Sequence, residues 1–309
     1  MRIKSSCYIC EKQCLVEVNH GNTINENYEA GAYKCTSLEH KSKPKVMNCL
    51  ICDLSFVPES NYPKDIESIY AEVQDPTYLE NKESRYKTFQ ESLKQISPFL
   101  PDKGHLLEVG SYCGFFLDAF KKKYSSWDYI GVEPSKWASE YARITLQINT
   151  KTGTLEDNIQ KLASDYDTVV AWDVLEHLND PLGFLIKINS VMKQDGIFCF
   201  STLDIDNWLP KLMGKHWPWL MQMHLFYYKT ETTAQLLKKA GFNMLRTEKY
   251  ILYVSFHYLA FILIAVLPDW LEKPLNIVRS FTPQKIMIPI SFGDIKLYIC
   301  KKEKTVGSM

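Results

Sequence analysis

Two pairs of closely spaced cysteines stand near the start of the chain. Each pair has the spacing Cys-x-x-Cys, and six of the nine cysteines lie within residues 1–60. The paired residues are Cys7, Cys10, Cys49 and Cys52. Four thiolates at this spacing are soft ligands that hold Zn²⁺ in tetrahedral geometry, whereas a redox pair would stand alone beside a βαβ unit. We therefore expect a structural zinc ion on these four cysteines. Cys14 and Cys35 are spare thiols, and either could replace one of the four.

A glycine-containing turn follows a short apolar run in the middle of the chain. Residues 106–115 have the sequence LLEVGSYCGF, with glycines at Gly110 and Gly114. Glycine tolerates positive φ and lets a ligand approach the backbone, and the amides that open the following helix attract polar or anionic groups. A dinucleotide fingerprint would need glycines where Tyr112 and Phe115 stand. The spacing therefore excludes an NAD-binding turn of that type.

Carboxylates end two successive apolar runs. Glu108 closes the run before the glycine turn, and Glu133 closes the next run, 25 residues later. In doubly wound sheets, a carboxylate at the second of these positions accepts hydrogen bonds from the two hydroxyls of a ribose. The position of Glu133 therefore predicts that a ribose is held at one edge of a sheet.

Two of the seven histidines stand where a general base would be useful. His177 follows an apolar run at residues 168–173, and His224 opens an aromatic stretch that ends at Tyr228. Imidazole suits proton abstraction near neutral pH. We expect His177 to be the base, oriented by Asp173 or Glu176, with His224 as the second candidate. A purely structural role remains the alternative for both histidines. His105, on an apolar run, is expected to be a packed core residue.

Strand-like and helix-like segments alternate from residue 104 onward. This alternation predicts an α/β fold with a mostly parallel sheet. Expected strands cover residues 105–109, 129–132, 168–173, 197–202, 245–252 and 295–301. Expected helices cover residues 115–124, 136–146, 181–192 and 230–240. We divide the chain into a zinc-ribbon-like module at 1–63, a helical linker or lid at 64–103, and an α/β domain at 104–309.

The overall composition is that of a globular protein. Hydrophobic residues make up 46% of the chain, and 36 Lys and Arg residues balance 36 Asp and Glu residues. The absence of a net positive charge argues against a nucleic-acid partner. The first residues lack the apolar core of a secretory signal, and cysteines without such a signal are expected to be thiols or metal ligands. We therefore expect a cytoplasmic protein.

One stretch, residues 250–268, contains no charged side chain. Its first residues are assigned to a strand, which leaves 253–267 as a helix of about 22 Å, too short for a bilayer core of about 30 Å. We expect a buried or interface-lying helix within a hydrophobic insertion at about 253–293. Contact with a membrane surface is the less favoured alternative.

The acid and glycine turn resemble the first motif of class I S-adenosylmethionine-dependent methyltransferases. Glu108, Gly110 and Gly114 match that motif, and Tyr112 replaces its usual central glycine. Three further motifs follow in the family's order. They are the ribose acid Glu133 with Pro134, the adenine loop with Thr154 and Leu155, and the fourth-strand sequence DTVVAWDVLEHLNDP at 167–181.

The resemblance covers about residues 85–246 and 295–302, and it is closest to the methyltransferase group with an N-terminal four-cysteine module. It implies a Rossmann-like sheet with helices on both faces, S-adenosylmethionine as cofactor, and zinc in the module. The implied acceptor is a hydroxyl of a sugar, glycan precursor or natural product. The cofactor residues implied are Glu108, Gly110, Tyr112, Gly114, Glu133, Pro134, Thr154, Leu155 and Asp173. A zinc-containing scaffold with an inactive methyltransferase-like domain is the alternative.

Overall fold

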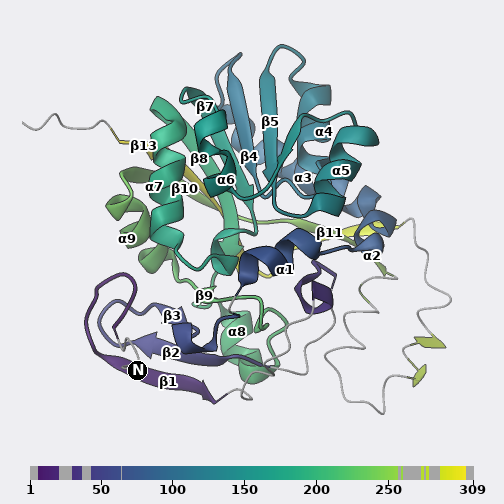
Figure 1. Ribbon diagram of the computed structural model, residues 1–309. Coiled ribbons are helices and arrows are strands. Elements are labelled where there is room, and N and C mark those ends of the chain that lie inside the picture. Colours follow the sequence, from purple (N-terminus) through teal and green to yellow (C-terminus); the bar gives the residue numbers. More distant parts are fainter. Residues whose placement is uncertain are drawn as a thin grey trace, which may run out of the picture.

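A seven-stranded sheet forms the centre of the protein (Figure 1). The computed structural model describes residues 6–20, 30–36, 43–63, 65–256, 259, 273–274, 276–277 and 286–303. The strand order is β10-β13-β8-β7-β4-β5-β6. The strands are β4 (His105–Val109), β5 (Asp128–Glu133), β6 (Thr150–Thr152), β7 (Tyr166–Trp172), β8 (Met192–Leu203), β10 (Phe242–Lys249) and β13 (Ile295–Lys302). Strands β8 to β6 are mutually parallel, and β13 is antiparallel to both β8 and β10.

Helices cover both faces of this sheet (Figure 1). The chain moves outward from β4 to β6 and then returns to β7 and β8, so right-handed crossovers place the connecting helices on opposite faces. One face carries α3 (Lys82–Ile96), α4 (Phe115–Lys123) and α5 (Lys136–Ile144). The other carries α7 (Pro181–Val191) and α9 (Thr230–Lys239). The predicted Rossmann-like, mostly parallel α/β fold is confirmed.

The strands at the centre of the sheet are buried on both sides. Leu106 and Leu107 in β4, and Val169 and Val170 in β7, are completely inaccessible to solvent. Such continuous apolar runs are typical of parallel strands that helices cover on both faces. The core therefore lies along β4 and β7, and their carboxyl ends form a fixed edge for a site.

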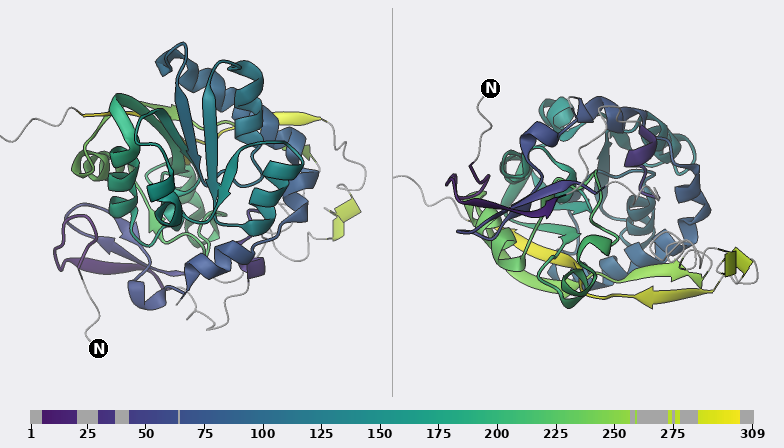
Figure 2. Two further views of the ribbon diagram at one scale, coloured as in Figure 1. Left: turned by 45° about the horizontal axis from the view of Figure 1, so that its top comes forward. Right: turned by 90° about the horizontal axis from the view of Figure 1, so that it is seen from below.

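A second, four-stranded sheet has the order β1-β2-β3-β9. Its strands are β1 (Leu15–His20), β2 (Lys45–Cys49), β3 (Ser55–Phe56) and β9 (Phe226–Tyr227). The short helices η1 (Ala30–Tyr33) and η2 (Glu59–Asn61) flank these strands in the chain. This sheet lies below the central sheet in Figure 1 and in the left view of Figure 2. Because β9 belongs to the α/β part of the chain, the cysteine module and the α/β domain share one sheet.

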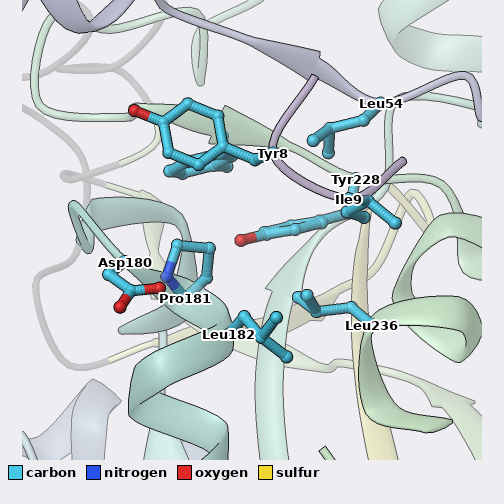
Figure 3. A pocket seen from close by; sticks show the side chains of 9 residues that line it. Tyr8, Ile9, Leu54, Asp180, Pro181, Leu182, Tyr228 and Leu236 are labelled. Atoms are coloured by element: carbon cyan, nitrogen blue, oxygen red, sulfur yellow. The ribbon is translucent and has the colours of Figure 1, made fainter. Parts of the chain in front are cut away.

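A small cavity of about 70 Å³ marks the contact between the module and the domain (Figure 3). Tyr8, Ile9 and Leu54 line it from the module, and Pro181 and Leu182 at the start of α7 line it from the domain. Ligand pockets are usually about 300–1,000 Å³. This cavity is therefore a packing gap at the contact rather than a substrate site.

Short helices connect the module to the central sheet. They are α1 (Ile66–Glu72), α2 (Pro76–Glu80) and η3 (Ser97–Phe99). Asp65 and Asp75 cap the first two helices by accepting hydrogen bonds from backbone N–H groups. The Ser135 hydroxyl at the end of β5 donates to the Val73 carbonyl at 2.8 Å, which attaches α1 to the carboxyl edge of the sheet. The remaining short helices are α6 (Leu155–Asn158), η4 (Ile159–Lys161), η5 (Leu175–His177), α8 (Trp208–Met213) and η6 (Gly214–His216).

The uncharged stretch does not begin as the expected helix at residue 253. Instead β11 (Leu252–Ser255) pairs antiparallel with β12 (Met287–Ile290), and the two strands continue the β10–β13 pair (right view of Figure 2). The paired residues lie 32 to 38 positions apart in sequence, so local periodicity did not reveal the pairing. The rest of the predicted helix, 257–258 and 260–267, lies outside the described residues. Within the described part of the chain, no helix has the length and apolarity needed to cross a membrane.

Candidate active site

The glycine turn between β4 and α4 requires both of its glycines. Gly110 has φ +75° and Gly114 has φ +77°, which is the left-handed region. A Cβ on Gly110 would lie 2.6 Å from the Val174 side chain, and one on Gly114 would lie 3.0 Å from Ala142. The turn is therefore closely packed against its neighbours, as expected for a loop that places backbone beside a ligand.

Tyr112 occupies the position where the resembling family usually has glycine, at φ +43°. Its ring packs edge-to-face on Tyr78 with centroids 4.6 Å apart and lies 6.2 Å from Trp137. Its hydroxyl is buried and has no hydrogen-bond partner among the described residues, as is also the case for Ser111 Oγ and Glu108 Oε2. Buried polar atoms are normally paired, so this group of atoms points to a polar ligand at the turn.

Glu133 lies where a ribose-binding acid is expected. Its side chain is 5% exposed, and its two oxygens accept hydrogen bonds from the backbone N–H groups of Tyr112 and Ser135, each at 2.8 Å. A carboxylate has about four acceptor sites, so each oxygen retains one for a ribose hydroxyl. Burial raises the pKa of Glu133 to about 7, against the lowering effect of the two N–H donors.

Glu108 lies next to Glu133 and is buried. Burial, together with the negative charge of Glu133, raises the pKa of Glu108 well above its ordinary value. Both effects favour the neutral carboxyl of Glu108, which can donate a hydrogen bond as well as accept one.

The predicted adenine loop follows β6 beside Glu133. The Gly153 N–H donates to the Glu133 carbonyl at 2.9 Å. Thr154 and Asp157 form a capping box at the start of α6, and Leu155 is buried. Pro134 stands between Glu133 and Ser135, the residue that caps α5. The structure thus brings these predicted residues to the same edge of the sheet.

Asp173 follows β7 in a left-handed conformation, with φ +52°. The Ser201 hydroxyl donates to its carboxylate at 2.6 Å, and the Asp173 N–H donates to the same hydroxyl at 2.9 Å. Burial raises the pKa of Asp173, while the Ser201 hydrogen bond and the Arg85 charge lower it.

Arg85 is a residue that the sequence analysis missed. Its guanidinium lies 4.8 Å from the centre of the Tyr78 ring and acts electrostatically on Asp173. It is the one arginine between residues 64 and 103, which is the signal that could have revealed it. A cation here could hold the carboxylate of an amino-acid ligand.

Cys35 extends from the module toward the same edge. The residue as a whole is exposed, but the surrounding protein desolvates its thiol and raises the pKa of that thiol to about 12. Arg85 lowers that pKa, whereas Asp75, Glu133 and Asp173 raise it, so the Cys35 thiol lies within electrostatic range of these groups. Thr36, its neighbour, donates both its N–H and its hydroxyl to Asp75, at 3.0 and 2.6 Å.

His177 lies at the carboxyl end of β7, but its ring is not oriented by Asp173 or Glu176 as expected. Its Nδ1 lies 3.0 Å from the Met223 carbonyl oxygen and 3.0 Å from the Tyr70 hydroxyl. A carbonyl only accepts, so Nδ1 carries the hydrogen and the neutral ring has its lone pair on Nε2. Burial lowers the pKa of His177 to about 4. The ring is therefore neutral at physiological pH, and its pKa is not raised by a neighbouring acid.

His224 lies against His177, with ring centroids 4.8 Å apart. Its side chain is 5% exposed, and its Nδ1 donates to the Trp219 carbonyl at 2.6 Å. Glu176 completes the cluster: burial and the Asp173 charge raise its pKa to about 8, and Thr202 donates to it at 2.9 Å. The structure therefore brings together both predicted histidines.

His105 is not a packed core residue, contrary to the prediction. It is the first residue of β4 and lies at the opposite, solvated edge of the sheet. Its Nε2 is 3.4 Å from an Asp128 carboxylate oxygen, and its Nδ1 is 3.5 Å from an Asp165 carboxylate oxygen.

The four expected cysteines lie together in the module. The Sγ atoms of all four lie within 4.8 Å of one another, with Cys7–Cys52 at 3.3 Å and Cys10–Cys49 at 3.5 Å. A tetrahedral zinc site with Zn–S bonds of about 2.3 Å requires sulfurs about 3.8 Å apart, and a disulfide requires about 2.05 Å. The separations fit zinc and do not fit a disulfide. Cys14 and Cys35 do not belong to the cluster.

Comparison with known proteins assigns the α/β part of the chain. A family model described as a methyltransferase domain matches residues 78–247. The ubiquinone biosynthesis O-methyltransferase of Rickettsia typhi is 26% identical over 166 residues, 47% of this chain and 67% of that protein. The same-named protein of Vibrio parahaemolyticus is 30% identical over 116 residues, 35% of this chain and 48% of that protein. The chain thus spans about two thirds of the first relative and about half of the second.

Solved structures with a similar arrangement include a possible histamine N-methyltransferase from Thermotoga maritima. It is 20% identical, with a TM-score of 0.48 and coverage of 72% of this chain and 91% of that one. A methyltransferase from Archaeoglobus fulgidus is 17% identical, with a TM-score of 0.48 and coverage of 74% and 100%. The family model alone matches more than half of the chain. The chain therefore belongs to this methyltransferase-domain family and is a class I S-adenosylmethionine-dependent methyltransferase.

Proposed function

We propose that this enzyme methylates a hydroxyl group of a small polar acceptor, namely a sugar, a glycan precursor or a natural product. The observation that carries the proposal is a pair of neighbouring imidazoles at the carboxyl edge of β7, the half-buried His177 and the buried His224. A hydroxyl must lose its proton as it is methylated, and a positioned base contributes about 10²–10⁴-fold to such a step. The relatives from Rickettsia typhi and Vibrio parahaemolyticus are named as O-methyltransferases, which supports an oxygen acceptor.

In this proposal the cofactor lies at the carboxyl ends of β4, β5, β6 and β7, between residues of these strands, of the start of α6 and of α3. Glu133 would accept the ribose hydroxyls, Thr154 and Leu155 would lie along the adenine, and Arg85 would hold the carboxylate of the amino-acid tail. Gly110 and Gly114 keep the turn close enough for the backbone to contact that tail. When bound there, S-adenosylmethionine supplies a methyl group on a positively charged sulfur. The chain's own task is to align the acceptor oxygen with that methyl group.

The acceptor side is formed by the histidine pair. With hydrogen on Nδ1, the Nε2 of a neutral ring accepts the hydroxyl proton, and the Nδ1–H bond to a carbonyl stabilises the resulting cation. The low pKa of His177 keeps it unprotonated at neutral pH but also makes it a weaker base than an exposed histidine. His224, 4.8 Å away, is therefore the second base to be tested.

The zinc site serves the architecture in this proposal. The cysteine cluster lies in the module, whose contacts reach the histidine-bearing part of the chain through β3 and β9. Four thiolates leave zinc no open coordination position, which is typical of a structural site. A catalytic role for this metal is therefore not part of the proposal.

The test measures S-adenosylhomocysteine formation with a panel of nucleoside-diphosphate sugars and with catechol as a phenolic probe. His177→Ala should lower turnover by about a hundredfold while S-adenosylhomocysteine affinity stays at the wild-type level. His105→Ala, at the opposite edge of the sheet, is the matched control and should keep full turnover.

Three results are informative. Normal turnover in His177→Ala together with loss in His224→Ala would move the base to His224. Normal turnover in both variants would refute a base-assisted hydroxyl transfer. Parallel loss of turnover, cofactor affinity and thermal stability in His177→Ala would show that His177 only shapes the loop.

A further inference from the structure

Asp294 lies at the carboxyl edge of the central sheet although it is far from the site motifs in sequence. Strand β13 runs antiparallel to β8, so it begins at the edge where the parallel strands end. Ile295, its first residue, pairs with Leu203 near the end of β8, and the Asp204 N–H donates to the Asp294 carbonyl at 2.8 Å. The topology therefore delivers the buried side chain of Asp294, 5% exposed, to the same edge as His177.

The Asp294 carboxylate holds two tryptophans from one irregular segment. Its Oδ2 accepts hydrogen bonds from the indole N–H groups of Trp217 at 3.0 Å and Trp219 at 3.1 Å. Hydrogen bonds to an ionised carboxylate are stronger than those between neutral groups. One buried oxygen thus fixes the position of both rings.

The segment that carries these tryptophans, residues 217–224, also carries His224 and is called the histidine segment below. Its backbone orients both imidazoles, since the Trp219 carbonyl binds His224 Nδ1 at 2.6 Å and the Met223 carbonyl binds His177 Nδ1 at 3.0 Å. In water, a neutral histidine favours hydrogen on Nε2. The carbonyl of Trp219 therefore imposes the opposite tautomer on His224, which leaves the lone pair on Nε2.

We propose that Asp294 is a positioning residue for His224: by holding Trp217 and Trp219 it fixes the Trp219 carbonyl, which in turn fixes the Nδ1–H tautomer of His224. The importance of this tautomer rests on the proposed function, in which His224 is a candidate base. The tautomer itself exists without any acceptor, so it can be measured separately.

The experiment records long-range ¹H–¹⁵N spectra of histidine-labelled, full-length protein saturated with S-adenosylhomocysteine, with His224 assigned by its loss in His224→Gln. In the wild type, His224 should show a protonated Nδ1 and an unprotonated Nε2. Asp294→Ala should lose this signature and give a mixture that includes the Nε2–H tautomer. Trp219→Phe, which removes only one indole N–H, should change the His224 signals in the same direction. The control is Asp206→Asn, because Asp206 is close in sequence to the end of β8 but pairs with Lys211 at 2.9 Å on the surface.

An Nε2–H tautomer in the wild type, or unchanged His224 signals in Asp294→Ala, would overturn the proposal. If Asp294→Ala fails to fold, as judged by loss of S-adenosylhomocysteine binding, Trp219→Phe decides alone: changed His224 signals support the proposal and wild-type signals overturn it. Failure of the proposed function would appear elsewhere, as full turnover in both His177→Ala and His224→Ala, and would not alter these spectra.

Discussion

Replacing Glu133 by glutamine should weaken the binding of S-adenosylhomocysteine by about tenfold to a hundredfold. Both carboxylate oxygens already accept a backbone N–H at 2.8 Å. A glutamine amide nitrogen cannot accept, so one backbone N–H and one ribose hydroxyl would lose their acceptor. A hydrogen bond to a charged group contributes about 1.5–3 kcal/mol, and about 1.4 kcal/mol corresponds to a tenfold change in Kd.

The pKa of Glu133 adds a pH dependence to this prediction. Burial raises that pKa to about 7, so without ligand the neutral carboxyl is the main form below this pH. Ribose hydroxyls donate best to the ionised form, so binding should release a proton from Glu133. Affinity should therefore rise with pH by at most about tenfold per unit below pH 7 and level off above it. In Glu133→Gln this dependence should disappear.

Isothermal titration calorimetry with S-adenosylhomocysteine at about pH 6, 7 and 8 measures both effects. Glu140→Gln is the matched control, because Glu140 is an exposed acid on the neighbouring helix α5 and should leave the affinity unchanged. Wild-type affinity in Glu133→Gln would refute the ribose assignment. A pH dependence that persists in this variant would assign the titration to another group.

Two further predictions concern the metal and the cofactor tail. Cys49→Ser should lose about one zinc ion per chain and unfold the cysteine module, whereas Cys14→Ser should keep the zinc ion and the folded module. Elemental analysis measures the zinc content, and circular dichroism measures the folding. A wild-type protein that is fully folded without metal would refute this prediction. Arg85→Met should weaken S-adenosylhomocysteine binding by about tenfold or more. Adenosine binding should stay unchanged, since adenosine lacks the carboxylate. An equal loss of affinity for both ligands would exclude the proposed contact between Arg85 and the carboxylate.

Local sequence signals were sufficient to predict the strands of the central sheet and the turns that follow them. The run at 105–109, the proline that opens α7 and the glycines at 110 and 114 each specify conformation within a few residues. Because parallel strands end at one edge, the order of these elements alone was enough to predict that Glu108, Glu133 and Asp173 would lie near one another. The position of these three acids at one edge of the sheet could be predicted for this reason.

Contacts between segments that are distant in sequence could not be predicted, because no local sequence pattern specifies the partner. The pairing of β3 with β9 joins Ser55 to Tyr227, and nothing local to either strand specifies that partner. The prediction of a helix from residue 253 was wrong for the same reason, because β11 pairs there with the distant strand β12. The orientation of His177 was also missed, because the neighbouring acids in sequence are not its partners and the groups that bind it, Tyr70 and Met223, lie on other elements.

The two sides of the site are therefore held by different kinds of contact, and this has a functional consequence. The proposed cofactor side depends mainly on turns that follow the parallel strands, and the hydrogen bonds of Glu133 in these turns come from Tyr112 and Ser135, not from the module. The proposed acceptor side depends on the histidine segment. The module contacts this segment through Lys43, whose ammonium donates to the Leu220 carbonyl at 3.0 Å. It also contacts the next residue, because the Val57 N–H donates to the Leu225 carbonyl at 2.8 Å. Loss of the module should thus impair methyl transfer more than cofactor binding. We therefore expect the four-cysteine module to support the proposed acceptor side of the enzyme.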